Sequence, residues 1–380
     1  MKNVDIIFIK YLDENMQITI GGIQTYITNL CNVIMGMGWR VRVVQFFDKD
    51  MEHFLENGVK VQGFCISGRD RYQALYDAAA NSRAGDTLTI FATDTIIPKR
   101  ISGKAIAIQH GIFWDRPKDK LCSLLRQVAA RAYVAYNIIR RIERVDGVIC
   151  VDYNFLNWYR TQVNKVSNLA TIIPNYTKIA PRFDKPDDCI KIIFARRLFD
   201  YRGTRVFTEA IKRILNEEYP VEITIAGTGP DEEWMKKQLS GFERVRFIKY
   251  QSNESLAIHK DQHIAIVPTI GSEGTSLSLL EAMSAQCAVI CSNVGGMTNI
   301  VIDNFNGLMV GSGEADALYK AIKQLLDDEN LREFIRKNGY ETVKAGFSYT
   351  NWQNKWVDFL KRVAHDDEEE NRNYDLALLP

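Results

Sequence analysis

Short apolar segments alternate with longer amphipathic segments through the first half of the chain. The apolar segments lie at 5–9, 40–47, 87–92, 105–110 and 147–152, and the segments with helical character at 22–37, 70–81 and 121–145. Apolar, β-branched strands separated by helices are typical of a mostly parallel sheet that is covered on both faces. The pattern therefore predicts a first α/β domain over residues 1–175.

A second set with the same alternation follows a proline-containing segment. Residues 174–188 hold three prolines and no regular period, which is typical of a linker. Strands are predicted beyond it at 189–196, 222–227, 245–250, 263–269, 287–293 and 307–310, and helices at 204–217, 231–239, 275–285 and 314–326. We expect a second domain over 176–348, so that two doubly wound, Rossmann-like domains face each other across a cleft at the carboxyl ends of their strands.

The end of the chain has a different character. A last helix is predicted over 349–364, whereas residues 365–380 are acidic and aperiodic. We expect this tail to be mobile.

Composition excludes several classes of function. Of the 380 residues, 46% are hydrophobic and 25% are charged, and the net charge of +1 argues against a strongly basic nucleic-acid binder. No apolar run reaches the ~18 residues that a membrane-spanning helix needs, and the N-terminal apolar segment is too short for a signal peptide. The seven cysteines are scattered without zinc spacing, so we expect reduced thiols, no metal site and a cytoplasmic location.

Positive charge is concentrated in one part of the first domain. Residues 1–175 hold 22 Lys and Arg against 16 Asp and Glu, and eight of these bases lie between Arg116 and Arg144. Such a segment could bind an anionic bilayer peripherally, on the inner face of the cell membrane. The alternative is a solvated helix face whose bases pair along the helix.

The segment SEGTSLSLLEAM holds two glutamates, Glu273 and Glu281, directly after a predicted strand. Gly274, Thr275 and Ser276 are typical of a turn and a helix N-cap, where free N–H groups can bind phosphate. A carboxylate beside such a site can accept hydrogen bonds from sugar hydroxyls. The alternative is a capped amphipathic helix with a solvated Glu281.

Three arginines follow another predicted strand in FARRLFDYRG: Arg196, Arg197 and Arg202. Guanidinium groups at a strand end suit phosphate oxygens. Surface pairing with Asp200 is the alternative.

Glycines at two further strand-to-helix turns allow a close approach to a ligand. Gly21 and Gly22 open the first predicted helix, and Gly227 lies in the AGTGP turn. Both turns could approach an anion or a nucleotide, although turn geometry alone would also place glycine there.

Two histidines and an Asp pair complete the candidates. His110 ends a predicted strand and could act on an acceptor hydroxyl or orient one. His263 lies inside an apolar strand, where a structural role is expected. Asp48 and Asp50 have the spacing of a divalent-metal site, but their charged surroundings favour a solvated turn.

Taken together, the segments GGIQTYITNL, IIPNY, ARRLFDYRG, AGTGP, EGTSLSLLEAM and NGLMV resemble, in this order, the family 4 glycosyltransferases of the GT-B fold. The resemblance covers almost the whole chain, and the spacing of Glu273 and Glu281 within that order is specific. It implies transfer of a sugar from a nucleotide-diphosphate donor, with retention at the anomeric carbon and without a metal or other cofactor. It also implies that the helix over 349–364 crosses back onto the first domain.

The same resemblance implies roles for single residues. Arg197 and Arg202 would bind the donor diphosphate, Glu281 the donor ribose, and Glu273 would lie near the donor sugar. Gly22 would lie close to the phosphates, and His110 near the donor sugar and the acceptor. We expect the remaining candidates on the donor side of the cleft: Gly21, Gly227, Gly274, Thr275 and Ser276.

At several positions the chain departs from the family pattern. Gln286 and Ala288 stand where the family commonly has Gly and Pro, and Thr298 and Asn299 stand where it often has Pro and Glu. The second pair lies in the loop that would touch the donor sugar, so the resemblance leaves the identity of that sugar open.

The function expected from these observations is that of a hexosyltransferase in cell-surface polysaccharide synthesis. The donor would be a UDP-sugar, or next a GDP-sugar, and the acceptor a glycan or a lipid-linked saccharide. Two alternatives stay open: a nucleotide-sugar epimerase of the same fold, and a catalytically silent, nucleotide-binding partner subunit. No nucleic-acid partner is expected.

Overall fold

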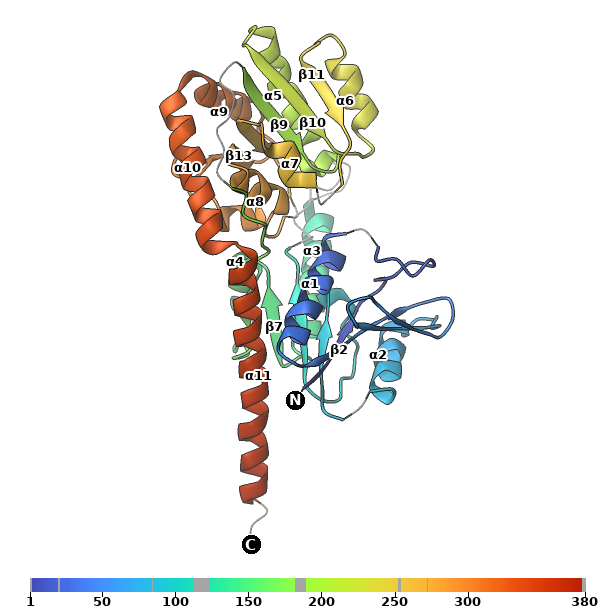
Figure 1. Ribbon diagram of the computed structural model, residues 1–380. Helices are drawn as coiled ribbons and strands as arrows, with labels where there is room; N and C mark the ends of the chain where they lie inside the picture. Colours follow the sequence, from blue (N-terminus) through green and yellow to red (C-terminus); the bar gives the residue numbers. More distant parts are fainter. Residues whose placement is uncertain are drawn as a thin grey trace.

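The computed structural model describes residues 2–19, 21–83, 85–112, 124–181, 189–251, 254–271 and 273–377, with side chains described as far as residue 364. Its two domains lie one above the other (Figure 1).

The first domain is built on a mostly parallel sheet. Its strands are β1 (Asn3–Ile7), β2 (Arg40–Phe46), β3 (Met51–Phe54), β4 (Lys60–Phe64), β5 (Thr87–Phe91), β6 (Ala105–Gln109), β7 (Gly147–Cys150) and β8 (Thr171–Ile172). The order across the sheet is β3-β4-β2-β1-β5-β6-β7-β8, and within the described part only the β3–β4 pair is antiparallel. The apolar runs that predicted strands are buried, because helices cover both faces of a parallel sheet.

Four helices of this domain cover the two faces. They are α1 (Gly22–Gly36), α2 (Arg71–Asn81), α3 (Leu124–Ile142) and α4 (Tyr153–Arg160). One core cluster contains the buried side of α1, and a second, on the other face of the sheet, contains the buried residues of α2, α3 and α4.

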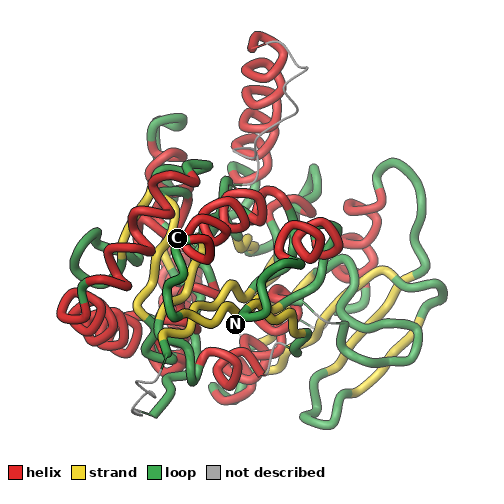
Figure 2. The backbone as a smooth tube through the Cα atoms, turned by 90° about the horizontal axis from the view of Figure 1, so that it is seen from above, coloured by secondary structure: helices red, strands yellow, loops and turns green. Residues whose placement is uncertain are grey.

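The second domain repeats this architecture with a sheet whose described neighbours are all parallel. Its strands are β9 (Ile190–Ala195), β10 (Val221–Ala226), β11 (Val245–Ile248), β12 (Ile264–Val267), β13 (Ala288–Ser292) and β14 (Leu308–Val310), in the order β11-β10-β9-β12-β13-β14. Its helices are α5 (Thr204–Asn216), α6 (Glu232–Leu239), α7 (Ser255–His259), α8 (Leu277–Ser284), α9 (Ala315–Asp327) and α10 (Glu329–Gly346). Seen from above, helices flank the central strands, and loops border the strands at the right of the view (Figure 2).

The last helix returns to the first domain, as the resemblance implies. Helix α11 (Tyr349–Ala377) continues from α10 and runs alongside the first domain (Figure 1). Trp352, Trp356 and Phe359 are buried in the same core cluster as α1. The indole Nε1 of Trp356 donates a hydrogen bond to the hydroxyl of Tyr26 on α1 at 3.0 Å.

The chain crosses between the domains twice, and the two crossings lie together. The backbone N–H of Thr177 donates to the carbonyl of Phe347 at 3.0 Å. The ring of Tyr176 packs against Tyr349 and Trp352, with ring centroids 5.1 and 4.8 Å apart. The first crossing falls within the predicted linker at 174–188, of which residues 182–188 lie outside the described residues.

Several elements were missed or misplaced by the sequence pattern. The pattern did not predict β3, β4, α4, β8, α7 and α10. Strands β3 and β4 alternate partly exposed residues, and α10 is rich in charged residues. The predicted helix at 121–145 corresponds to α3, and residues 121–123 lie outside the described residues.

The expectation of an aperiodic tail over 365–380 also needs correction. The helix does not end at residue 364 but continues to Ala377. The segment is rich in Glu, which has a high helix propensity, and it extends a helix that is already formed. Residues 378–380 lie outside the described residues.

Candidate active site

The carboxyl end of the second sheet carries a buried ionic cluster around Glu273. Its Oε2 accepts hydrogen bonds from Arg196 Nη2 and from the Thr269 hydroxyl, both at 3.0 Å, and from Arg202 Nη1. The side chains of Arg196, Arg202 and Glu273 are 5%, 15% and 9% exposed. Burial alone would raise the pKa of Glu273, but the charges of Arg196 and Arg202 hold it below its usual value. The cluster is therefore an ionised carboxylate with two cations, and its net charge is positive.

The two neighbouring arginines of FARRLFDYRG have different surroundings. Arg196 is buried in the cluster, whereas Arg197 is exposed and its guanidinium lies 5.6 Å from the centre of the Phe199 ring. The local pattern offered all three arginines as phosphate ligands, whereas the resemblance assigned the diphosphate to Arg197 and Arg202 and not to Arg196. The structure brings Arg202 to Glu273, and it places Arg197 one residue further along, outside this ionic cluster. Asp200 pairs with Arg205 at 3.9 Å, so the alternative of a surface pair between Asp200 and these arginines is not what the structure shows.

The start of α8 lies beside the same cluster. Ser276 is its N-cap residue and is buried, and it contributes to the low pKa of Glu273. The N–H groups of the first helical turn have no partner within the helix, and the positive end of the helix dipole adds to the charge of the arginines. This edge of the second domain therefore favours an anion.

Thr275 has a role that its sequence position did not reveal. Its hydroxyl donates to the carbonyl of Val151 in the first domain, and its own carbonyl accepts from Asn175 Nδ2 at 2.9 Å. The side chain is thus committed to a contact between the domains. The expectation that Thr275 binds the donor can apply only to its backbone.

Glu281 lies further along α8 in an apolar setting. The hydroxyl of Ser255, at the start of α7, donates to its Oε2. Burial raises the pKa of Glu281 to about 7, and the nearby carboxyl contributes to a raised pKa of about 12 at Tyr250. Its carboxyl group is half-buried, so it can accept a hydroxyl donor from a bound ligand at modest desolvation cost.

Glycines let the two domains touch near the carboxyl ends of β6 and β12. A Cβ added to Gly274 would lie 2.8 Å from the carbonyl oxygen of His110, and one added to Gly111, where φ is +105°, would lie 2.9 Å from the Cα of Gly274. Both distances are shorter than normal van der Waals contact. The backbones of the two domains can approach this closely only because neither residue has a side chain.

His110 faces this contact from the first domain. Because the carbonyl of Ala92 can only accept, the Nε2–H of His110 donates to it, at 2.9 Å, which leaves Nδ1 unprotonated in the neutral ring. The ring of Tyr26 packs edge-on against the imidazole, with centroids 5.5 Å apart. Burial lowers the pKa of His110 to about 4, so the ring is neutral at physiological pH.

The glycines of the other two turns are placed differently. Gly22 is the first residue of α1, and a Cβ on it would lie 3.8 Å from Leu277 at the start of α8, so the two helix starts lie opposite each other. Gly21 precedes it in extended backbone. A Cβ on Gly227 would lie 2.1 Å from the carbonyl oxygen of Arg196, so this glycine lets two loops of the second domain pack together.

The loop after β13 contributes residues that sequence reasoning assigned to the donor sugar. Asn299 Oδ1 accepts from the backbone N–H of Tyr153, at the start of α4, at 3.0 Å. Asn299 therefore joins the domains, as Thr275 does.

Gln286, just before β13, has φ +58°, a conformation that favours glycine, which is the residue the resembled family commonly has there.

The remaining candidates are structural. His263 Nδ1 accepts from the backbone N–H of Lys191 at 3.0 Å. Asp50 Oδ1 accepts from the backbone N–H of Cys65 at 2.8 Å. Among the residues that the structure describes, no three His, Cys, Asp or Glu side chains are grouped so that they could hold a metal ion.

Comparison with known proteins shows a family match within the second domain. Residues 175–342 match the model of the family described as Glycosyl transferases group 1. An uncharacterized glycosyltransferase of Methanocaldococcus jannaschii, MJ1607, is 27% identical over 179 residues, which cover 46% of this chain and 45% of that protein. The phosphatidyl-myo-inositol mannosyltransferase of Mycolicibacterium smegmatis is 25% identical over 337 residues, which cover 82% of this chain and 83% of that protein. With the first of these relatives, the match therefore spans less than half of either protein.

Solved structures extend the likeness to both domains. Sucrose-phosphate synthase from Thermosynechococcus elongatus superposes with a TM-score of 0.76 at 18% identity and covers 96% of this chain and 100% of that chain. Anabaena Alr3699/HepE in complex with UDP-glucose superposes with a TM-score of 0.71 at 14% identity and covers 95% and 99%. These likenesses confirm the GT-B fold. Residues 175–342 therefore match the glycosyl transferases group 1 model, and the whole chain shares its two-domain fold with solved GT-B proteins.

Proposed function

We propose that this protein transfers a hexosyl group from a nucleotide-diphosphate sugar to a glycan or lipid-linked saccharide in cell-surface polysaccharide synthesis. The observation that carries the proposal is the cluster of Glu273, Arg196 and Arg202 beside the start of α8, facing His110 across the interdomain contact. A UDP-sugar is the first choice of donor, because the similar HepE structure holds UDP-glucose. A GDP-sugar is the second choice.

The donor side of the site suits the charge that sugar transfer creates. Cleavage of the bond from the sugar to the diphosphate develops negative charge on the leaving group. Arg202, the exposed Arg197 and the N–H groups at the start of α8 would stabilise that charge without a metal ion. Glu273 holds the arginines in place, since its carboxylate already accepts three hydrogen bonds.

The other candidate residues would position the rest of the substrates. Glu281 would accept hydrogen bonds from the ribose hydroxyls, which would compensate for its partial burial. The unprotonated Nδ1 of His110 would accept a hydrogen bond from the donor sugar or the acceptor. We propose that the acceptor attacks on the face that the diphosphate leaves, so that the anomeric configuration is retained.

Calorimetric titration with UDP, GDP, dTDP and ADP tests the donor site. We expect one nucleotide to bind, and Arg202→Ala to weaken its binding at least tenfold, because a charge-assisted contact to the phosphates is lost. Arg244→Ala removes an exposed arginine at the amino end of β11 and is the matched control. Failure of all four nucleotides to bind would contradict the proposal.

Turnover separates the transferase from the two alternatives. The nucleotide-sugar that matches the bound nucleotide is incubated with and without saccharide acceptors, and the products are followed by nuclear magnetic resonance. A new glycosidic bond with the anomeric configuration of the donor supports the proposal. A changed sugar without an acceptor would indicate an epimerase, and nucleotide binding without any product a silent partner subunit.

We also propose that α3 places the protein on an anionic membrane surface, where lipid-linked acceptors are found. Leu124, Leu125 and Tyr133 on this helix are 75%, 82% and 70% exposed, and Arg126 and Arg131 lie between them. Exposed apolar side chains among bases are typical of a helix that lies in a bilayer interface. Arg116 and the other bases before residue 124 lie outside the described residues. In the part of the chain that the structure describes, no helix is long and apolar enough to cross a bilayer.

A further inference from the structure

A pocket opens at the edge of the first sheet that lies opposite the interdomain cleft. Its volume is about 470 Å³, within the range of small-molecule sites. It is lined by the first residues of four neighbouring parallel strands: Asn3 of β1, Arg40 of β2, Lys60 of β4 and Thr87 of β5. The active-site candidates lie at the carboxyl ends of the strands, whereas the pocket lies at their amino ends, and a seven-residue strand such as β2 is about 20 Å long. The pocket is therefore separate from the cleft.

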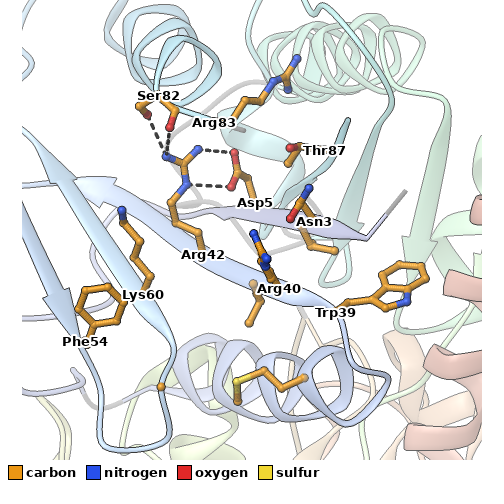
Figure 3. A pocket seen from close by; sticks show the side chains of 14 residues that line it. Asn3, Asp5, Trp39, Arg40, Arg42, Phe54, Lys60, Ser82, Arg83 and Thr87 are labelled. Carbon is orange, nitrogen blue, oxygen red and sulfur yellow. Dashed lines mark hydrogen bonds and ion pairs between the residues drawn. The ribbon is translucent and has the colours of Figure 1, made fainter. Parts of the chain in front are cut away.

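The acidic residue in the pocket wall, Asp5, is already neutralised. Asp5 and Arg42 are paired residues of β1 and β2, and Arg42 Nε donates to Asp5 Oδ1 at 2.8 Å. Arg42 also donates to the carbonyl of Ala79 at 2.9 Å and to the hydroxyl of Ser82 at 2.8 Å, at the end of α2. This buried pair forms a fixed, neutral wall (Figure 3), so Asp5 does not repel an anion.

Arg40 and Arg83, which have no carboxylate partner among the described residues, leave the pocket positively charged. Among the described residues, Arg40 is exposed and makes no ion pair, and Arg83 donates to the neutral carbonyl of Ser102 at 3.2 Å. Lys60 pairs with Glu52 at 2.7 Å. Arg40 lies in the middle of the pocket, between Lys60 on one side and Trp39 on the other (Figure 3). An anion bound at Arg40 would therefore meet positive charge around it.

An aromatic side chain and several polar groups complete the lining. Trp39, which is half-buried, and the more exposed Phe54 present apolar surface, and Asn3, Ser82 and Thr87 carry polar groups. An aromatic ring can pack against the apolar face of a sugar ring, while guanidinium and ammonium groups bind phosphate. A monosaccharide that carries a phosphate group would use both features.

We propose that this pocket is a second ligand site, specific for a phosphorylated monosaccharide, on the face of the first domain away from the cleft. The phosphate of the ligand would lie at Arg40, with Lys60 and Arg83 at the rim of the pocket. The sugar ring of the ligand would lie against Trp39. The proposal does not depend on the transferase activity proposed above.

Calorimetric titration with glucose 6-phosphate, inorganic phosphate and glucose tests the site. We expect glucose 6-phosphate to bind with one-to-one stoichiometry, inorganic phosphate to bind more weakly, and glucose not to bind. Arg40→Ala should weaken the binding of glucose 6-phosphate by about tenfold or more, since a charge-assisted contact is lost. Arg69→Ala removes an exposed arginine of the same domain outside the pocket and should leave binding unchanged.

Further variants distinguish this pocket from the cleft. Arg202→Ala, which alters the donor side of the cleft, should leave the binding of glucose 6-phosphate unchanged. The proposal would be overturned if Arg202→Ala lost the binding of glucose 6-phosphate while Arg40→Ala kept it. Equal affinity of Arg40→Ala and Arg69→Ala for glucose 6-phosphate would also overturn it, as would the absence of binding to the wild type. Inorganic phosphate that binds as tightly as glucose 6-phosphate would overturn the assignment of a sugar. Because Arg40 is exposed, its replacement should leave the melting temperature unchanged, which checks that the variant is folded.

Discussion

Glu273 shows how the charge state of one residue organises the donor side of the cleft. Two guanidinium groups and the Thr269 hydroxyl converge on its carboxylate, and the pKa of the group is lowered although it is buried. A carboxylate with so many partners is a poor proton acceptor. At the residue scale this carboxylate therefore holds Arg202 in place, and in the proposed function Arg202 would bind a substrate phosphate.

Replacement of Glu273 should destabilise the fold. In Glu273→Gln the arginines Arg196 and Arg202 keep their charges but lose their counterion, and an uncompensated buried charge costs about 3 kcal/mol or more. Urea denaturation should show a lower midpoint for this variant than for Glu243→Gln, which changes an exposed residue. Equal midpoints would contradict the ionised cluster.

His110 should make the free energy of unfolding depend on pH in the acidic range. Its pKa is about 4 in the folded protein, against 6.5 for an ordinary histidine. His110 is therefore protonated below pH ~6.5 in the unfolded chain but only below pH ~4 in the folded protein. The free energy of unfolding falls as the pH is lowered through that window, by up to ~3 kcal/mol.

The matched variants are His110→Gln and His53→Gln. We expect His110→Gln to remove part of the loss of stability between pH 6.5 and pH 4, measured by urea denaturation at each pH, and His53→Gln to retain the loss. The same pH profile in His110→Gln and wild type would show that His110 does not carry the effect.

At the scale of elements, α11 is the connection that ties the second domain to the core of the first. Its buried Trp352 and Trp356 pack edge-on around Tyr26 of α1, with ring centroids 5.1 and 6.2 Å from it, and Tyr26 in turn packs against His110. The helix thus supports a candidate site residue through one intermediate ring.

The hydrogen bond from Trp356 to Tyr26 can be measured by a double-mutant cycle. Trp356→Phe leaves the Tyr26 hydroxyl without its indole donor and should cost about 2 kcal/mol of unfolding free energy. Tyr26→Phe should cost less when Trp356 is already replaced, with a coupling of about 1 kcal/mol. Additive losses would mean that the bond contributes nothing to stability.

Helix α3 should determine membrane binding. Vesicle sedimentation with anionic lipid should show weaker binding of Arg126→Ala and of Arg131→Ala, by about fivefold each, since a base near an anionic surface is worth about 1 kcal/mol. Arg160→Ala, at the exposed end of α4, is the control. Equal binding of the wild type to neutral vesicles would argue against the electrostatic attraction.

At the scale of the whole molecule, the relative position of the domains depends on a few backbone contacts. Gly111 and Gly274 lie against each other, and the hydrogen bonds of Thr275 and Asn299 cross the same boundary. The Glu273 cluster and His110 belong to different domains, so the transfer proposed above would require this close approach.

Gly274→Ala should separate the domains. The added methyl group would lie 2.8 Å from the carbonyl oxygen of His110, whereas in the control Gly241→Ala it would meet nothing within 4 Å. We expect Gly274→Ala to increase the radius of gyration measured by X-ray scattering and to reduce transfer by tenfold or more. An unchanged radius and full transfer activity would show that the contact is dispensable.

The sequence by itself determined the architecture of this protein. Apolar runs at 5–9 or 263–269, separated by helices, encode strands that are buried on both faces, and that local periodicity is sufficient to predict parallel sheets and the edge where ligands bind. Motif order located the candidate segments around Arg202 and Glu273, and the end of a predicted strand located His110. Elements with weak periodicity, such as β3 and α10, were missed because their stability comes from the partners against which they pack.

The tertiary structure alone decided which side chains meet. Arg196 rather than Arg197 is buried against Glu273, 77 residues away, and Asn299 contacts Tyr153 across 146 residues. The phosphate-binding pocket proposed at Arg40 likewise exists only because four strands, distant in sequence, begin at one edge of the sheet. Local pattern fixes which residues are buried within an element, whereas contacts between elements depend on strand order and domain packing, which no short segment encodes.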